Sequence, residues 1–318
     1  MTSPLAHTPP NTPPPPTYPL IFASLDALFS VVLAIFFGGA AKAVTINVGV
    51  NAIGFSQALA PILVLSFVYG YRFGSPLNAL KGVAASLFPS RNPPRLLLLH
   101  LLQLLILILS WPTKLDFFSS AVIDSSSQLL SCASSTSILW APAFEEITFR
   151  LVAFYVTLNR SGGNVHFAAL VSACLFGAIH IANVYATGAV SLYAWLQVIQ
   201  ASVAGWTWTL LFVKSGSVMD TIFLHTANNL VAVVYLSREV SSGVSKTCSD
   251  AMSSTFITQA LLASILLQVS TYLLESLFLW TSIERLASNA DGVLKLRELH
   301  PIMYQAKKQD IRQQEKES

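Results

Sequence analysis

The most constraining feature of this sequence is a series of apolar blocks, separated from one another by short polar connectors. Several blocks reach the roughly 20 residues that a helix needs to cross a hydrocarbon core of about 30 Å. Only 10% of the 318 residues are charged, whereas soluble domains have about 25%. A helix satisfies its backbone hydrogen bonds within one segment, as a chain in lipid must. The sequence therefore predicts an all-α, polytopic membrane helical bundle.

The apolar blocks predict about eight transmembrane helices. These cover residues 19–41, 51–70, 95–112, 137–158, 164–182, 190–213, 217–236 and 255–280. We also expect a short interfacial helix over residues 75–90, between two prolines. The Ser-rich segment 127–136 is expected to form a loop or a short re-entrant piece.

The predicted organisation has three parts. Residues 1–18 are rich in proline and predict a disordered tail, with a docking site for a proline-binding module as the alternative. Residues 19–283 form the transmembrane domain, and residues 284–318 form a polar tail. There is no internal repeat, which argues against a transporter built from paired halves. The net charge of +3 gives no support for binding to nucleic acid.

Ionisable side chains inside the apolar blocks are the main candidates for function. Such groups cost several kcal/mol at bilayer depth unless they are paired or hydrated. They are Asp26, His100, Glu145, Glu146, Arg150, His180, His225 and Glu275. The isolated residues Asp26, His100 and Glu275 are expected to bind neighbouring helices or to line a polar cavity.

The stretch EEITFR contains three of these groups within six residues. Glu146 and Arg150 are four residues apart, so they share one helical face and can form an ion pair. Glu145 is rotated about 100° from Glu146 in a helix of about 3.6 residues per turn. We therefore expect Glu145 to point elsewhere, without that partner, and to be available for chemistry.

Two histidines and one asparagine on later spans can complement Glu145. His180 lies in CLFGAIHIANV, and His225 lies in FLHTANNL with Asn229 one turn later on the same face. A glutamate, two histidines and an asparagine can activate water and stabilise an oxyanion. The residues alone leave a second interpretation open, in which they form a buried polar network that holds helices together.

Three motifs in this order, EExxxR, FxxxH and HxxxN, resemble those of the CPBP family of CaaX prenyl proteases, also called the Abi or Rce1-like family. They are EEITFR, FGAIH and HTANN, and the resemblance covers residues 135–235. It implies a membrane-embedded glutamate protease. By matching position, Glu145 would activate water with help from His180, while His225 and Asn229 would polarise the scissile carbonyl. Glu146 and Arg150 would brace the site.

The resemblance implies a peptide or a prenylated protein as substrate, within the lipid bilayer. The best-known members of the family remove the C-terminal tripeptide of prenylated CaaX proteins. After His180 the sequence reads IAN, where eukaryotic CaaX enzymes tend to carry a further histidine. HTANN also lacks their aromatic residue and cysteine, so both motifs are closer to the bacterial and plastid branch. The alternatives are a peptidase with other targets and a non-catalytic membrane scaffold.

No cofactor is expected, although the residue types raise the question of zinc. Glu145, His180 and His225 with an open position would also make a catalytic zinc site. The HExxH helix motif of zinc peptidases is absent from the sequence. We therefore favour catalysis without a metal and keep zinc as the minority alternative.

The distribution of basic residues predicts the orientation. With eight spans both termini lie on one side, which also collects most of the 18 Lys and Arg residues. The other side has Lys42, Lys114, Arg238 and Lys246. The positive-inside rule then places both termini in the cytosol. The family resemblance implies the membrane of the endoplasmic reticulum for a eukaryotic CaaX protease, and otherwise a plastid or plasma membrane. Glu145 and His180 lie closer to the opposite side, so either the span count is off by one or the cleft is deep.

Overall fold

The computed structural model describes residues 19–45, 50–73, 83–87, 136–182, 192–241 and 259–288. Its long helices are α1 (Leu20–Thr45), α2 (Val50–Phe73), α9 (Val165–Ile179), α11 (Leu192–Ser215), α12 (Val218–Ser241) and α14 (Gln259–Ala287). A further helical rod runs through η2 (Thr136–Trp140), α7 (Ala141–Glu146), η3 (Ile147–Ala153) and α8 (Phe154–Arg160). The described residues contain no strand, which confirms the all-α prediction.

The helices coincide with the predicted spans wherever the structure describes the chain. The predicted span 95–112 lies outside the described residues, as do the Pro-rich tail and most of the polar tail. Of the predicted interfacial helix, only a helical turn at residues 83–87 is described. Among the described helices, the stretches Leu20–Lys42 and Trp195–Ser215 are long and apolar enough to cross a membrane. Phe55–Ser66 and Val165–Ile179 are apolar but shorter.

The rod from Thr136 to Arg160 changes its helical pitch on both sides of the two glutamates, and once more where α8 begins. The segments η2 and η3 are π-helical, and α7 between them has normal α-helical geometry. Pro142, near the start of α7, has no backbone N–H and therefore cannot make the regular α-helical bond at that point. Short π segments inside helices are frequent at functional sites. The local geometry thus singles out the same stretch as the clustered charges.

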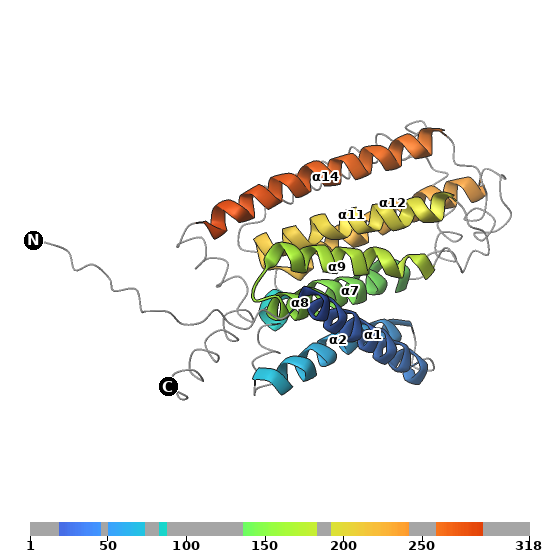
Figure 1. Cartoon of the computed structure of the whole chain (residues 1–318). Helices are drawn as coiled ribbons and strands as arrows, with labels where there is room; N and C mark the ends of the chain where they lie inside the picture. Colours follow the sequence, from blue (N-terminus) through green and yellow to red (C-terminus); the bar gives the residue numbers. More distant parts are fainter. Residues whose placement is uncertain are drawn as a thin grey trace, which may run out of the picture.

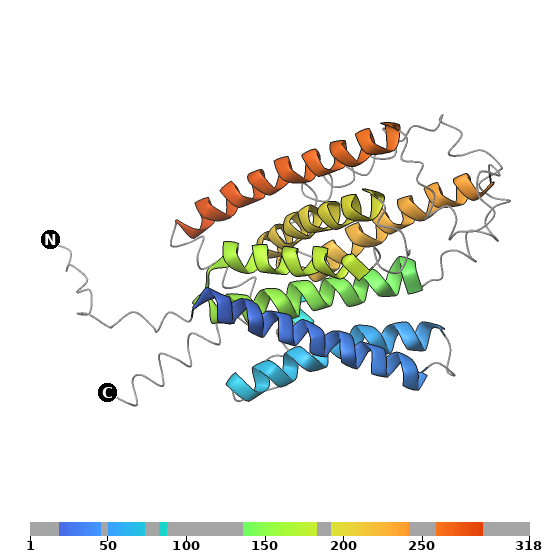
Figure 2. The same ribbon diagram turned by 45° about the vertical axis from the view of Figure 1, so that its right-hand side comes forward.

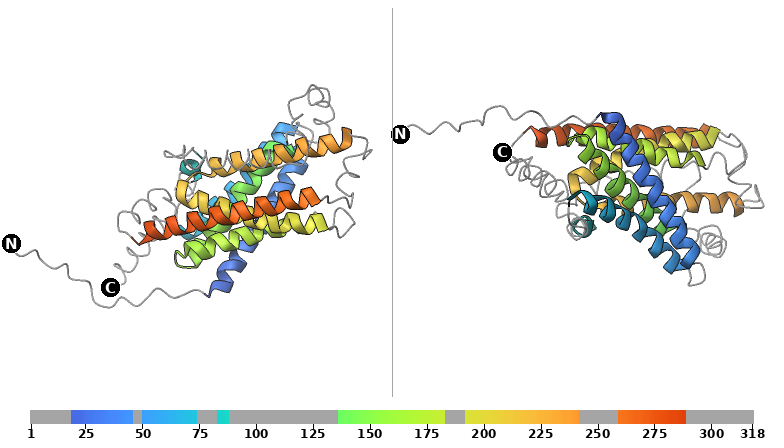
Figure 3. Two further views of the ribbon diagram at one scale, coloured as in Figure 1. Left: turned by 90° about the horizontal axis from the view of Figure 1, so that it is seen from above. Right: turned by 60° about the horizontal axis from the view of Figure 1, so that its bottom comes forward.

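The rod lies in the middle of the bundle, with the other helices packed around it (Figures 1 and 2). Helices α1 and α2 pack against each other and against η3, while α9 packs on η3 and α8. Helix α11 packs against α9 and α14, and α12 contacts α7 and α11. Figure 3 shows α14 running along the outside of the bundle. The residues of the rod are consequently enclosed from several sides.

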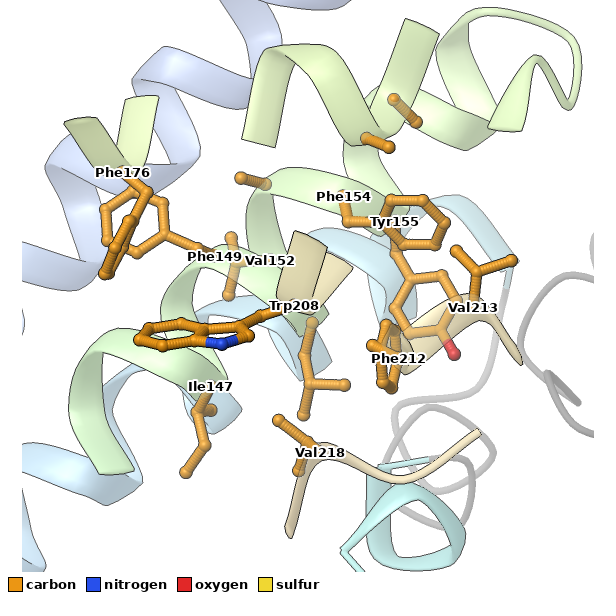
Figure 4. Packing of buried hydrophobic residues seen from close by; sticks show 14 of the residues in the cluster. Ile147, Phe149, Val152, Phe154, Tyr155, Phe176, Trp208, Phe212, Val213 and Val218 are labelled. Atoms are coloured by element: carbon orange, nitrogen blue, oxygen red, sulfur yellow. The ribbon is translucent and has the colours of Figure 1, made fainter. Parts of the chain in front are cut away.

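A buried aromatic cluster fills the space between the rod, α9 and α11 (Figure 4). Phe154, Tyr155 and Phe212 contact one another with ring centroids 5.5 to 5.8 Å apart. Nearer the polar cluster, Phe149 meets Phe176 edge to face at 5.2 Å. Edge-to-face contacts of this kind stabilise more than their area alone. The aromatic core fixes the rod against α9 and α11.

Helices α9 and α11 approach closely because small residues line their contact. A Cβ atom on Gly177 would collide with Ser202 and lie 3.1 Å from the carbonyl oxygen of Val198. A Cβ atom on Gly205 would lie 2.8 Å from Cδ1 of Phe176. Small residues at such points let two helix backbones pack closely. Gly205 thereby leaves room for the ring of Phe176.

Candidate active site

Three separate segments bring the candidate residues together. Glu145 and Glu146 end α7, Arg150 lies in η3, His180 caps the C-terminal end of α9, and His225 lies on α12. The rod is enclosed between α9 and α12, so its polar side chains face those two helices rather than open solvent.

Glu146 and Arg150 form the ion pair that their spacing predicts. The Arg150 Nε atom donates to Glu146 Oε2 at 2.8 Å, and Nη2 donates to Oε1 at 3.2 Å. Both side chains have no solvent exposure. Such a paired fork is the strongest geometry available to a guanidinium and a carboxylate.

The other side of the Arg150 guanidinium is held by α9 and α11. Its Nη1 atom donates to Ser172 Oγ at 3.3 Å and to Thr209 Oγ1 at 3.1 Å. The Ser172 hydroxyl donates to the carbonyl of Phe149 at 2.8 Å. The face of the Phe176 ring covers the guanidinium at 5.0 Å. Arg150 therefore ties the rod to two neighbouring helices as well as to Glu146.

His225 lies between the two glutamates. Its Nδ1 atom is 3.0 Å from Glu146 Oε1, and its Nε2 atom is 3.7 Å from Glu145 Oε2. Because the carboxylate of the ion-paired Glu146 only accepts hydrogen bonds, Nδ1 carries a proton and donates it. This contact fixes the ring with Nε2 directed at Glu145.

The helical phase of Glu145 and Glu146 gave no indication that the two carboxylates share a partner. The two side chains diverge along the rod, yet they contact opposite nitrogens of the same imidazole. The two nitrogens of an imidazole on a facing helix are far enough apart to reach the carboxylates of two successive helical residues. The sequence spacing could not show this because His225 is 79 residues from Glu146.

Glu145 has one carboxylate oxygen without a hydrogen-bond partner. Oε2 is buried and makes no hydrogen bond with any residue that the structure describes. The side chain as a whole keeps 22% of its exposure, whereas that of Glu146 has none. A buried oxygen without a partner is costly to maintain and calls for an explanation by function or by a bound molecule. Glu145 is therefore the chemically open member of the cluster.

His180, at the C-terminal end of α9, is held by its own helix. Its Nδ1 atom is 3.0 Å from the carbonyl oxygen of Phe176. A carbonyl only accepts hydrogen bonds, so Nδ1 carries the proton and Nε2 of the neutral ring is an acceptor. Phe176 lies between the imidazoles, with ring centroids 5.2 Å from His180 and 5.6 Å from His225. The FxxxH motif thus places an aromatic spacer between the histidines.

Asn229 is the fourth residue of the predicted catalytic set. It lies on α12 one turn after His225 and is half-buried.

The remaining candidates lie apart from this cluster. Asp26 pairs with Arg160 at the end of α8, as expected for an acid that binds a neighbouring helix. Glu275 is buried on α14. His100 lies outside the described residues.

Several residues of the site have no counterpart in the sequence motifs. Trp208 on α11 packs against His225 with ring centroids 4.9 Å apart. Ser172 was detectable in principle, because Ser172, Phe176 and His180 follow one another at four-residue spacing on a single face of α9. Thr209 and Trp208 offered no such signal, since their helix carries no recognisable motif.

The described residues contain no group of three His, Cys, Asp or Glu side chains placed to hold one metal ion. The Nε2 atom of His225 is directed at Glu145, and the ring of His225 packs against the indole of Trp208.

Fold and site together define an all-α bundle that encloses a cluster of two glutamates, an arginine and two histidines. Residues 128–231 match the family model described as type II CAAX prenyl endopeptidase Rce1-like. This segment is therefore an Rce1-like domain, which confirms the resemblance inferred from EExxxR, FxxxH and HxxxN. The family is one of membrane-embedded proteases. Searches of curated proteins and of solved structures gave no match.

Proposed function

We propose that this protein is an intramembrane glutamate-type endopeptidase, with the C-terminal tripeptide of prenylated CaaX proteins as its candidate target. The observation that carries this proposal is the state of Glu145. Its Oε2 atom is buried without a hydrogen-bond partner among the described residues and faces Nε2 of an oriented histidine. Its neighbour Glu146 is fully engaged by Arg150 and His225. A base that takes a proton from water needs a carboxylate oxygen without a partner, as in Glu145, and not an ion-paired carboxylate, as in Glu146.

In the proposed reaction, a water molecule donates one proton to Glu145 Oε2 and hydrogen-bonds to Nε2 of His180 through the other. As the proton moves to Glu145, the oxygen of the water forms a bond to the scissile carbonyl carbon. The negative charge develops on the carbonyl oxygen, which Asn229 and the imidazolium form of His225, protonated on both ring nitrogens, would stabilise. Collapse of this intermediate breaks the C–N bond, and Glu145 returns its proton to the leaving nitrogen.

Glu146 and Arg150 have a supporting role in this mechanism. Glu146 holds His225 through Nδ1, which leaves Nε2 for the reacting groups. Arg150 compensates the charge of Glu146 and links the rod to Ser172 and Thr209. Rigid support of this kind keeps catalytic groups within the narrow geometry that a reaction requires.

We further propose that the chain crosses the bilayer about eight times with both termini in the cytosol. The membrane would be that of the endoplasmic reticulum, a plastid or the cell surface. The lipid bilayer and a peptide or prenylated protein are its partners in this proposal, and no cofactor takes part. Two sufficiently apolar helices and a membrane-embedded family support it.

The proposal is tested with the purified full-length chain in liposomes and a panel of prenylated and unprenylated peptides. We expect hydrolysis by the natural sequence and none by Glu145→Gln. Cleavage of prenylated CaaX peptides alone supports the CaaX assignment. Equal cleavage of unprenylated peptides instead identifies a peptidase with other targets. Full activity in Glu145→Gln would refute the glutamate mechanism.

One observation favours a second candidate function, a non-catalytic membrane scaffold. The contacts of Glu146 and Arg150 with Ser172, Thr209 and His225 join four helical segments through polar groups. Such a network can serve purely to hold helices together. In that case Glu145→Gln leaves the biological function intact in cells.

The zinc alternative has its own test. Protein treated with a chelator is assayed before and after addition of zinc, with metal content measured in parallel. We expect chelation to leave hydrolysis unchanged. Activity that is lost with the metal and restored by zinc alone would establish a zinc peptidase.

A further inference from the structure

Helix α14 lies outside residues 128–231, which match the family model, yet it docks directly onto helices of the site. Its inward face carries Gln268, Tyr272, Ser276, Leu279 and Ile283, at spacings of three or four residues. Ser276 Oγ and Thr207 Oγ1 of α11 are 2.8 Å apart, and the Thr207 hydroxyl also reaches the carbonyl of Tyr272 at 3.1 Å. These contacts fix α14 along α11, the helix that carries Trp208.

Tyr272 reaches the candidate site through a single intermediate ring. Its ring meets Trp208 edge to face, with centroids 6.1 Å apart and an interplanar angle of 87°. Trp208 is 2% exposed and lies against His225 at 4.9 Å, tilted by 35°. The edge of Phe176 confines the imidazole from a second direction. Tyr272 therefore borders the indole that lies against the His225 ring.

Gln268, one turn before Tyr272 on α14, makes a separate contact with α12. Its side-chain amide accepts a hydrogen bond from Gln200 of α11 and donates one to Asn228 Oδ1 at 3.2 Å. Asn228 is three residues after His225 and directly precedes Asn229. The amide of Gln268 thus joins α11 to α12 at the level where α12 presents its candidate residues.

We propose that Gln268 and Tyr272 of α14 are positioning residues for His225. Tyr272 sets the tilt of the His225 ring through Trp208, and Gln268 fixes the rotation of α12 through Asn228. The catalytic consequence rests on the proposed function, whereas the effect on the His225 ring does not. Neither residue touches the reacting atoms. Together they make a helix outside the Rce1-like segment part of the working site.

The main variant is Tyr272→Met, which keeps much of the buried volume but removes the aromatic edge against Trp208. Tyr272→Phe keeps that edge and serves as the conservative rescue. Ser276→Ala is the matched control, because it weakens the same helix contact at Thr207 without touching Trp208. Gln268→Met is a second, independent variant that removes the hydrogen bond to Asn228.

The first measurement is the imidazole signal of His225 in NMR of histidine-labelled full-length protein, assigned with a His225→Gln variant. The signal depends on the nearby indole ring and needs no enzymatic activity. We expect it to shift in Tyr272→Met and Gln268→Met, and to stay at its natural position in Tyr272→Phe and Ser276→Ala. An unchanged signal in both Met variants would overturn the proposal. This measurement decides the matter even if the natural protein cleaves no peptide, in which case only the proposed function fails.

The second measurement is peptide hydrolysis in liposomes. We expect kcat to fall by about tenfold in Tyr272→Met and Gln268→Met with KM changed less than about twofold, since small displacements of a catalytic group reduce the rate strongly. Tyr272→Phe should restore kcat. The proposal would be overturned if Ser276→Ala and Tyr272→Met had the same melting temperature and an equally low kcat. That result would show that α14 acts only through stability.

Discussion

At the residue scale, Glu145 and Glu146 are neighbours in the sequence and differ in the donors that each carboxylate meets. Glu146 accepts from two atoms of Arg150 and from His225. Glu145 faces the same histidine at the longer distance of 3.7 Å, and its Oε2 atom is otherwise without a partner among the described residues. The two glutamates thus differ in their ability to act as a base, because only Glu145 can exchange a proton without breaking an ion pair.

This difference predicts opposite outcomes for the same substitution at adjacent positions. Glu145→Gln should lower peptide hydrolysis by at least about 100-fold, the usual contribution of a general base, and leave the melting temperature close to that of the natural protein. Glu146→Gln should lower the melting temperature, because it leaves Arg150 as an uncompensated buried charge. Rates and thermal unfolding are measured on both proteins in the same detergent. Loss of stability in Glu145→Gln and not in Glu146→Gln would reverse the assignment.

Arg150 gives a second prediction at this scale. Removal of one partner from a buried pair costs about 3–5 kcal/mol, so Arg150→Met should unfold well below the natural protein. The double variant Glu146→Gln with Arg150→Met removes both charges and should lose less than the sum of the single variants. Unfolding of the four proteins forms a double-mutant cycle. Simple additivity would show that the pair is not coupled.

The sequence predicted this part of the site only as far as local spacing reaches. Four-residue spacing correctly predicts the contact of Glu146 with Arg150. The position of His225 between both acids depends on how α12 crosses the rod, and a single sequence does not specify helix crossings. The same holds for Thr209 and Trp208, which come from a helix with no motif. Their roles follow from packing rather than from the pattern of residues.

At the scale of helices, the apolar blocks predicted the positions of the helices well, because length and hydrophobicity decide both. The changes of pitch in η2 and η3 were not predicted. They occur near Pro142 and among buried side chains. Neither feature changes the spacing of hydrophobic residues enough for the altered pitch to be recognised in the sequence. The rod is therefore the element where sequence patterns are least informative and the chemistry is concentrated.

Two adjacent glycines of α1 test how tightly the neighbouring helix supports this rod. A Cβ atom on Gly38 would lie 2.8 Å from Cε2 of Phe144, the residue before Glu145, whereas one on Gly39 would meet nothing within 4 Å. Alanine should raise helix stability by up to about 1 kcal/mol at an open position. We therefore expect Gly39→Ala to be active and at least as stable as the natural protein.

In Gly38→Ala the added methyl group displaces the ring of Phe144 and disturbs Glu145. We expect hydrolysis to fall by about tenfold relative to Gly39→Ala, since a displaced base reacts poorly. Both variants are compared by rate and by thermal unfolding in one preparation. Equal rates would mean that Phe144 moves freely and that α1 does not support the site.

At the scale of the whole molecule, the helices run back and forth between two ends of the bundle. Helix α1 begins, and α2, α8 and α14 end, at one of these ends, whereas η2 begins at the other (Figures 1 and 2). The ion pair of Asp26 with Arg160 joins the start of α1 to the end of α8. This arrangement agrees with the alternation that eight spans require.

The depth of Glu145 follows from its place in the rod. Fifteen residues separate it from Arg160, or about 22 Å of helix, and nine separate it from Thr136, or about 14 Å. A substrate that enters from the end where α8 terminates must therefore penetrate more than half of the rod. An extended peptide of about seven residues spans that distance.

The orientation itself is tested with single cysteines in a background that lacks Cys132, Cys174 and Cys248. Ser288 follows α14 at the end where α1 begins, and Lys42 lies near the opposite end of α1; both side chains are exposed. Because basic residues concentrate on the side of the termini, the positive-inside rule places Ser288 in the cytosol. Ser288→Cys should react with a membrane-impermeant maleimide added from the cytosolic face of sealed vesicles. Lys42→Cys should react only from the other face, and labelling of both from one face would contradict the predicted topology.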